Sequence, residues 1–153
     1  MDDTDTPPIG LLLRLLDLHV TRLAADRLAD IDVSPAEMSV LGTIDAAPGL
    51  RASAVAAALM IKPPNLTKLV NGLEARAFVR RTVSREDERA VALDLTPKGK
   101  RAVAFGQQLT RDIERVLLAD VPPDMRDRLL PALTMALRAA QRASRRMAAD
   151  TPG

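Results

Sequence analysis

The sequence predicts a mostly α-helical fold with one β-hairpin, in the order α-α-α-α-β-β-α-α. Leu and Ala dominate the apolar residues and aromatic side chains make up 1% of the chain, a composition typical of helices. Apolar residues recur at helical spacing over most of the length. Between residues 78 and 95 this period shortens to two, which indicates strands. With 153 residues, the chain has the size of one ordinary domain.

Three helices are predicted in the first part of the chain. Residues from Ile9 to about Asp30 carry leucines near helical spacing. In "DVSPAE", Ser34 can act as an N-cap, with Pro35 at the first helical position and Glu37 completing a capping box. This second helix stops at "APG", and a short third helix runs from Arg51 to Leu59.

The fourth predicted helix runs from Pro63 to about Arg76, since prolines are tolerated in a first helical turn. Its apolar stripe is formed by Leu66, Leu69, Val70 and Leu73. The opposite face is polar and carries Pro64, Asn65, Thr67, Lys68 and Asn71.

A β-hairpin is predicted next, formed by "FVRRTV" and "RAVALDL" around the charged connection "SREDE". One face of the second strand should carry Val91, Leu93 and Leu95. The other face should carry Ala90, Ala92 and Asp94.

Two long helices complete the predicted order. Thr96 is predicted as the N-cap residue before Pro97, where a fifth helix begins and runs to about Ala119. "DVPPDM" breaks it, and a last helix spans about Asp124 to Met147. Pro131 lies inside this helix and should kink it or mark its true start.

The formal net charge of +2 hides an uneven distribution of charge. Residues 1–61 carry 4 basic and 9 acidic side chains, residues 62–101 carry 10 and 5, and residues 102–153 carry 8 and 6. A basic block inside a nearly neutral chain is typical of a protein that binds a polyanion. On charge alone, a solvated surface with scattered charges fits about equally well.

The composition also excludes several classes of protein. The chain has no Cys, which rules out disulfides and thiolate metal sites and suits a reducing compartment. The acidic start "MDDTDTPPIG" is unlike a secretory signal, and no apolar run approaches 18 residues, so we expect a cytoplasmic protein. Nucleophile, phosphate-loop and dinucleotide motifs are missing, and His19 is the single histidine. We therefore expect neither an enzyme nor a cofactor or metal site.

A short helix, a tight turn, a second helix with a polar outer face and a charged hairpin together make a winged helix-turn-helix. The second of these helices fits the major groove of DNA, where its first residues reach base edges. An arginine at the hairpin tip can enter the narrower minor groove, whose negative potential favours a guanidinium.

These residues resemble the MarR (multiple antibiotic resistance regulator) family of transcription factors. The segment "SAVAAALMIKPPNLTKLVNGLEARAFVRR" looks like the family's helix-turn-helix, and "DERAVALDLTPKG" resembles its wing signature. The matching residues of the signature are Asp87, Arg89, Leu95, Thr96 and Gly99. The resemblance extends from about Ile9 to Met147, nearly the whole chain.

The resemblance implies a homodimeric, sequence-specific regulator, most simply a repressor that blocks its promoter. Residues 9–33 and 97–147 would form the dimerisation helices and residues 34–96 the DNA-binding domain, with a disordered tail at 1–8 and a flexible C-terminus at 148–153. Two winged domains would read a pseudo-palindromic operator with half-sites about one helical turn apart. An intramolecular core is the alternative interpretation of the terminal helices.

Carried over by position, the polar face of the fourth helix would meet the major groove through Pro64, Asn65, Thr67, Lys68 and Asn71. Lys68 replaces a common arginine of the family and is expected to contact phosphate more than base, because an ammonium cannot form the bidentate fork. Arg89, oriented by Asp87, would enter the minor groove, and Arg85 at the tip is the second candidate. A surface ion pair is the alternative for Asp87 and Arg89.

Two further positions are candidates for phosphate contacts. Ser53 begins the third helix, where a hydroxyl could bind a phosphate or simply cap the helix. Lys62 stands where the family usually has a Ser or Thr cap, so about 1 kcal/mol of capping is expected to be missing. The family commonly has glycine at the positions of Met60 and Ala77. A positive φ at Met60 would therefore cost free energy, and Ala77 should disfavour a left-handed C-cap.

Many relatives of this family respond to small anionic or phenolic compounds bound between the dimer helices and the winged domain. The sequence does not localise such an effector site. A winged helical module that binds protein rather than DNA is the alternative function, and the basic recognition face argues against it.

Overall fold

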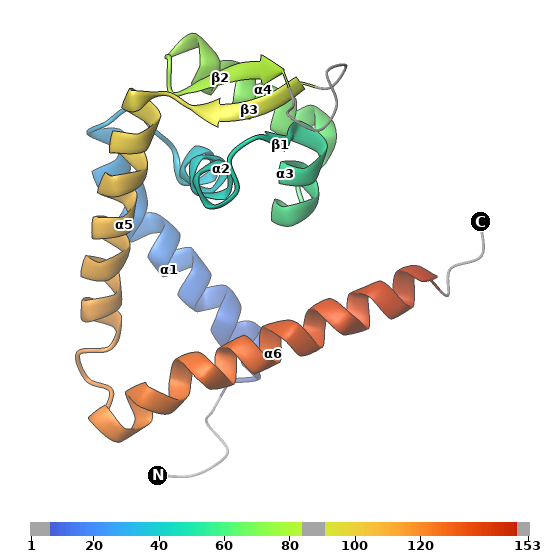
Figure 1. Cartoon of the computed structure of the whole chain (residues 1–153). Helices are drawn as coiled ribbons and strands as arrows, with labels where there is room; N and C mark the ends of the chain where they lie inside the picture. The colour runs from blue at the N-terminus through green and yellow to red at the C-terminus, as the bar shows by residue number, and fades with distance from the viewer. Residues whose placement is uncertain (1–6, 84–90, 150–153) are drawn as a thin grey trace. The chain divides into compact units, whose positions relative to one another are not determined.

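The computed structural model describes residues 7–83 and 91–149. The chain divides into a unit from Met1 to Ile113 and a second unit from Glu114 to Gly153, and each is described by itself. The elements are α1 (Ile9–Ala29), α2 (Pro35–Ala46), β1 (Leu50–Arg51), α3 (Ala52–Leu59), α4 (Pro63–Ala75), β2 (Val79–Val83), β3 (Val91–Leu95), α5 (Pro97–Leu117) and α6 (Pro123–Ala149) (Figure 1). The mostly helical fold with a hairpin between the fourth and fifth helices is confirmed.

The sheet has three strands rather than the two that were predicted. Its order is β1-β3-β2, and both pairings are antiparallel, with Leu50 opposite Leu93 and Val79 opposite Leu95. The short strand β1 was missed because two residues are too few to produce an alternating pattern. Through this strand, the segment before α3 pairs with the hairpin strand β3.

The predicted alternation of β3 is only partly correct. Leu93 and Leu95 are buried as expected, but Ala92 is also buried and Val91 is exposed. Ala92 pairs with Arg51 on one side and with Thr82 on the other. Directly paired residues project to the same face of a sheet, so these two longer side chains cover the small alanine.

Helices α2, α3 and α4 and the sheet share one hydrophobic core. These elements (residues 34–96) are called the winged domain below. Its largest fully buried side chain is Phe78, which follows α4. The predicted apolar stripe of α4 is confirmed, since Leu66, Val70 and Leu73 are buried and Leu69 is half-buried.

Two predicted N-caps are present. The Ser34 hydroxyl accepts the Glu37 amide at 3.2 Å, and the Glu37 carboxylate accepts the Ser34 amide at 2.9 Å, which completes the capping box of α2. At the start of α5, the Thr96 hydroxyl accepts the Gly99 amide at 3.1 Å. Both helices therefore begin where the sequence places them.

Helices α1, α3 and α4 all end on a left-handed residue that is not glycine. These residues are Asp32 (φ 56°), Met60 (φ 53°) and Ala77 (φ 58°). After α4, the Phe78 amide donates to the Leu73 carbonyl and the Ala77 amide to the Glu74 carbonyl, each at 2.9 Å. This pair of bonds is a Schellman motif, and the same pattern of bonds closes the other two helices.

The expectation that Ala77 disfavours a left-handed cap is therefore wrong. The next residue, Phe78, is 1% exposed and must enter the core directly after the helix ends. Burial of an aromatic ring stabilises the fold by more than the roughly 1–2 kcal/mol that a left-handed alanine costs. The anticipated cost at Met60 does arise, because its φ is positive.

Replacing Ala77 with glycine is expected to raise the free energy of unfolding by about 1 kcal/mol, since glycine adopts a left-handed conformation without steric cost. Urea denaturation would measure the change. Ala57→Gly, the same exchange inside α3, is the matched control and should lower stability by about 0.5–1 kcal/mol. A loss of stability in both variants would contradict the left-handed conformation at Ala77.

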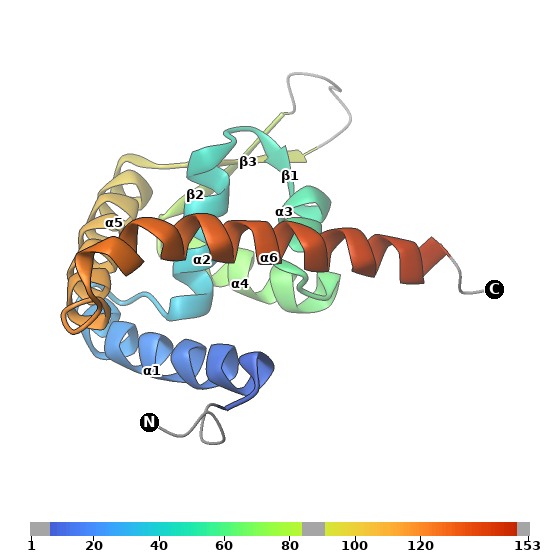
Figure 2. The same cartoon turned by 90° about the horizontal axis from the view of Figure 1, so that it is seen from below.

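Helix α1 contacts α2, and its single buried residue, Leu28, lies near its C-terminal end. Figure 1 shows the rest of α1 running away from α2, and Figure 2 shows the same helix from below. Its exposed apolar side chains are Ile9, Leu11, Leu12, Leu13, Leu15, Leu16, Leu18 and Leu23. Within one chain, these leucines do not form the intramolecular core that was the alternative interpretation of the first helix.

The second unit consists of the end of α5 and the long helix α6. None of the described side chains of α6 is buried, and Met125, Leu130, Leu133, Met135 and Leu137 are exposed. The helix begins at Pro123 and continues through Pro131, which therefore does not mark its start.

The ends of the chain bear on two sequence predictions. Helix α6 includes Ala148 and Ala149, which were assigned to a flexible C-terminus, and residues 150–153 lie outside the described part. Of the predicted tail at residues 1–8, only Pro7 and Pro8 are described, and neither is helical.

Among the helices described, none combines the length and apolar character that a membrane span requires.

Candidate nucleic-acid interface

The outer face of α4 is exposed while its inner face is fixed in the core. The buried inner face is held by Leu66, Val70 and Leu73. All six candidate residues on or next to the outer face are exposed, namely Lys62, Pro64, Asn65, Thr67, Lys68 and Asn71. No ion pair joins Lys62 or Lys68 to another residue in the described ranges. The winged domain thus presents a polar helix face with two positive charges available to a ligand.

The start of α4 does not need a capping side chain. A cap normally accepts the amide of the second or third helical residue. Here the second residue is Pro64, which has no N–H group, and the amide of Asn65 already donates to the Lys62 carbonyl at 3.0 Å. The expected loss of about 1 kcal/mol at Lys62 is therefore wrong, because no donor is left unsatisfied.

The same geometry limits how this helix end could hold an anion. The first two helical residues are prolines, and the amides of Asn65 and Leu66 both donate to the Lys62 carbonyl. Free backbone N–H groups, which usually bind phosphate at a helix start, are therefore missing here. Any phosphate contact at this point has to come from the Lys62 ammonium.

Arg81 of β2 reaches across to α4 and was not identified from the sequence. Its Nη2 donates to Asn71 Oδ1 at 2.7 Å, and its Nη1 forms an ion pair with Glu74. Because a guanidinium only donates, Asn71 must present its oxygen to Arg81 and direct its amide NH₂ elsewhere. Asn71 is thereby left as a hydrogen-bond donor on the outer face. The local pattern gave no signal for this contact, which joins two different elements.

The segment between α3 and α4 places two other sequence candidates on the surface. The N-cap of α3 is Arg51, so Ser53 is the second helical residue, and its cap role is excluded. Its side chain is exposed. Met60, in the left-handed turn between the helices, is 93% exposed.

The tip of the wing, with the candidates Arg85, Asp87 and Arg89, lies outside the described residues. The described base of the wing carries further charge on its outer face. There Arg80 lies 3.9 Å from Asp94, and the Thr82 hydroxyl donates to the same carboxylate at 3.3 Å. These contacts fix the two strands next to each other just before the tip.

Comparisons with known proteins agree with this geometry. Residues 31–90 match the model of the MarR family. The solved structure of the transcriptional repressor CouR, bound to a 23-mer DNA duplex, is 32% identical, covers 85% of this chain and 92% of that one, and has a TM-score of 0.74. The chain belongs to the MarR family.

Two other known proteins are similar to this chain. The reduced form of MarR from Escherichia coli has a TM-score of 0.79 at 24% identity, over 87% of this chain and 98% of that one, which shows a shared fold. A protein of Thauera aromatica, named as a transcriptional regulatory protein for the hcr operon, is 36% identical over 76 residues. That match spans 50% of this chain and 46% of the relative.

The structure gives a physical reason for the Thr-x-x-Gly signature in this MarR-family chain. The Thr96 hydroxyl lies 2.6 Å from the Ala77 carbonyl and 3.2 Å from the Phe78 carbonyl, while capping α5 through Gly99. A side chain on Gly99 would overlap the Phe78 carbonyl oxygen. Thr96 and Gly99 together allow α5 to pack closely on the turn that ends α4.

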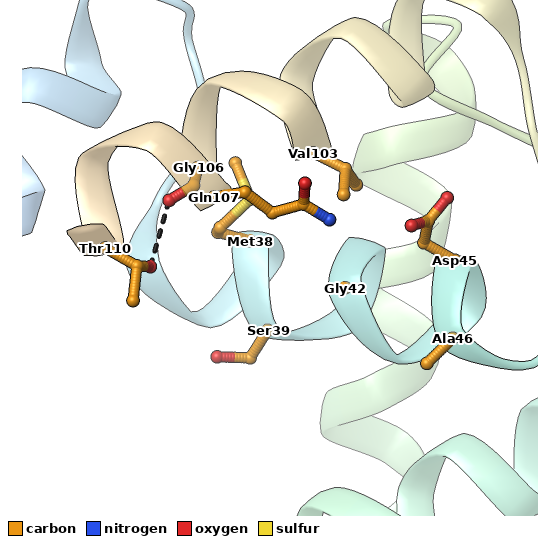
Figure 3. A pocket seen from close by; sticks show the side chains of 9 residues that line it. All are labelled: Met38, Ser39, Gly42, Asp45, Ala46, Val103, Gly106, Gln107 and Thr110. Carbon is orange, nitrogen blue, oxygen red and sulfur yellow. Dashed lines mark hydrogen bonds between the residues drawn. The ribbon is translucent and has the colours of Figure 1, made fainter. Parts of the chain in front are cut away.

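A groove of about 480 Å³ lies between α2 and α5 of the first unit (Figure 3). It is lined by Met38, Ser39, Gly42, Asp45, Ala46, Val103, Gly106, Gln107 and Thr110. The Thr110 hydroxyl donates to the Gly106 carbonyl at 2.9 Å. The only charged group of this lining is the Asp45 carboxylate, so the groove offers no cation to an anionic compound. His19, on α1, is exposed.

Proposed function

We propose that this MarR-family protein is a dimeric regulator of transcription that binds a pseudo-palindromic operator. The observation that carries the proposal is the orientation of α4, whose apolar stripe is buried and whose polar, positively charged face is exposed. The DNA duplex in the structure of CouR supports DNA as the partner. By blocking a promoter, such a protein would act as a repressor.

Each candidate residue has a proposed role at the duplex. The residues proposed to face the major groove are Pro64, Asn65, Thr67, Lys68 and Asn71. Asn71 would act there as a donor, because its oxygen is occupied by Arg81. Ser53 and Lys62 would bind phosphate and set the register of the helix in the groove. Arg89, oriented by Asp87, would read the minor groove, with Arg85 as a second contact.

The dimer is supported by the unpartnered apolar residues of α1 and α6. A soluble single chain rarely leaves two long helices with this many exposed leucines, whereas a two-fold partner could cover them. The two winged domains would then present their α4 helices to successive turns of one face of the duplex.

The response to a small molecule is proposed for the groove between α2 and α5. This groove joins a helix of the winged domain to a helix of the dimerisation region, so a bound compound could change how the two are arranged. Its lining supports a neutral or cationic ligand better than the anionic compounds common in the family, because Asp45 would repel a carboxylate.

Replacing Lys68 with alanine is expected to weaken DNA binding and to reduce the slope of log affinity against log salt concentration by about one unit, as the loss of one phosphate contact predicts. Operator fragments would first be selected in vitro from genomic DNA, and binding would then be measured by fluorescence anisotropy. Arg111→Ala removes one positive charge from α5 and is the control. An unchanged slope in the Lys68→Ala variant would show that Lys68 does not contact a DNA phosphate.

The alternative, a winged module that binds another protein, makes a different prediction for the same measurement. Binding to DNA should weaken steeply between low and physiological salt, because counterions are released. An apolar protein interface should respond little to salt. Failure to select any duplex from genomic DNA would favour this alternative.

A further inference from the structure

One side chain, Arg76, joins the end of the recognition helix to the turn between α1 and α2. Its Nη2 forms an ion pair with Glu37 at the start of α2. Its Nη1 donates to the Asp32 carbonyl and lies 3.5 Å from the Asp32 carboxylate. Its Nε donates to the Gly72 carbonyl at 3.0 Å, which fixes the guanidinium on its own helix. All three side-chain nitrogen atoms of Arg76 therefore contact carbonyl or carboxylate groups, which belong to three residues.

The contacts of Arg76 are partly shielded from water. Its side chain is 27% exposed and that of Glu37 is 13% exposed. The guanidinium lies 5.6 Å from the centre of the Phe78 ring, and the Lys98 ammonium lies 4.1 Å from the same ring and donates to the Arg76 carbonyl. An ion pair in such a site is stronger than an exposed one, because solvent screens it less.

Arg76 connects the end of α4 to the turn that follows α1. Asp32 is the left-handed residue that ends α1, and Arg76 directly precedes Ala77, the left-handed residue that ends α4. Glu37 also completes the capping box with Ser34, so the same carboxylate holds both the start of α2 and Arg76. The direction of α1 is thereby tied to the direction of α4.

We infer that Arg76 is a positioning residue that transmits the geometry of the dimerisation arm α1 to the recognition helix α4. The inference rests on the proposed function, since it needs a dimer held through α1. Among the described residues of α1, only Leu28 near its C-terminal end is buried, so the direction of α1 relative to α4 depends on the contacts of this junction. In a dimer, the junction sets the separation of the two recognition helices and hence the half-site spacing that the protein accepts.

This role differs from that of a residue that only stabilises the fold. Loss of stability lowers the amount of active protein and weakens binding to every duplex by the same factor. Loss of positioning weakens binding to the correct spacing and relaxes the preference between spacings. One inserted base pair rotates a half-site by about 35°, which two rigidly held helices cannot follow.

The test compares operators with the natural half-site spacing and with one base pair inserted. Arg76→Lys keeps the charge but loses the planar fork, and Glu37→Gln keeps a capping side chain but loses the ion pair. Both variants are expected to reduce the preference for the natural spacing by about tenfold relative to wild type. Ser34→Ala is the matched control, since it removes the capping box but leaves the carboxylate for Arg76, and its preference should stay at the wild-type value.

A second measurement does not need DNA. The chain has no Cys, so Thr67→Cys introduces a single site on α4 for a spin label. Pulsed electron paramagnetic resonance would measure the distribution of distances between the two labels of a dimer. This distribution should broaden in the Arg76→Lys and Glu37→Gln variants but not in the Ser34→Ala variant.

Equal spacing preferences and equal distance distributions in all variants would overturn the inference while leaving the proposed function intact. A wild-type protein that selects no duplex would overturn the proposed function, and in that case unchanged distance distributions would overturn the inference as well. Broadened distributions would then still support the link between α1 and α4.

Discussion

Replacing Leu16 with glutamate is expected to separate the proposed dimer into monomers while each chain stays folded. Leu16 is 43% exposed in the single chain and lies in the middle of α1, among its exposed leucines. Burial of one leucine contributes about 1.5–3 kcal/mol, and a two-fold interface contains the residue twice. The dissociation constant of the dimer should therefore rise at least about 100-fold.

Sedimentation velocity over a range of protein concentrations would measure this change. Thr21→Glu adds the same charge to the opposite face of α1 and is the control, with little effect expected on the dimer. Circular dichroism would verify that both variants keep the helical content of the wild type. A Leu16→Glu protein that sediments as the wild type does would show that Leu16 lies outside the dimer interface.

Replacing Gly99 with alanine is expected to lower the free energy of unfolding by about 2–3 kcal/mol. The added Cβ would overlap the Phe78 carbonyl oxygen and lie 3.1 Å from the carbonyl carbon. That carbonyl cannot easily move, because it accepts the Thr96 amide at 3.0 Å. Overpacking against a fixed backbone costs about 1–3 kcal/mol or more, which exceeds the gain of about 1 kcal/mol from replacing a helical glycine.

The matched control for this prediction is Gly42→Ala in α2. A Cβ at Gly42 meets no other atom within 4 Å, so only the gain in helix propensity remains. Its stability should rise by up to about 1 kcal/mol. Urea denaturation of both variants would thus show changes of opposite sign, and a stabilised Gly99→Ala protein would contradict the close packing of α5 on Phe78.

The helices could be predicted because their signals lie within a few residues of each other. The capping box of Ser34 and Glu37 and the cap of Thr96 are each built within four positions of sequence. The apolar stripe of α4 is likewise a local repeat. It correctly identified the buried face of the helix, and the opposite face is therefore the exposed one. For the same reason, the exposed positions of the candidate interface could be named before the structure was known.

Errors arose where a local rule competed with a contact from elsewhere in the chain. Ala77 adopts a left-handed conformation against its own preference, because the core requires Phe78 immediately after α4. The start of α4 needs no cap, because Pro63 and Pro64 lack the amides that a cap would satisfy, and this could have been noticed from the sequence. The strand β1 exists only because β3 lies beside it.

By itself, the sequence determined the order of the helices, their starts, the wing and the polar face of the recognition helix. These depend on caps, prolines and periodicity, all of which act over one or two turns of chain. The tertiary structure alone decided that Arg81 holds Asn71 and that Arg76 reaches Glu37 and Asp32, which lie 39 and 44 residues away in sequence. Such contacts have no local pattern, since they form only after the core has brought separate elements together.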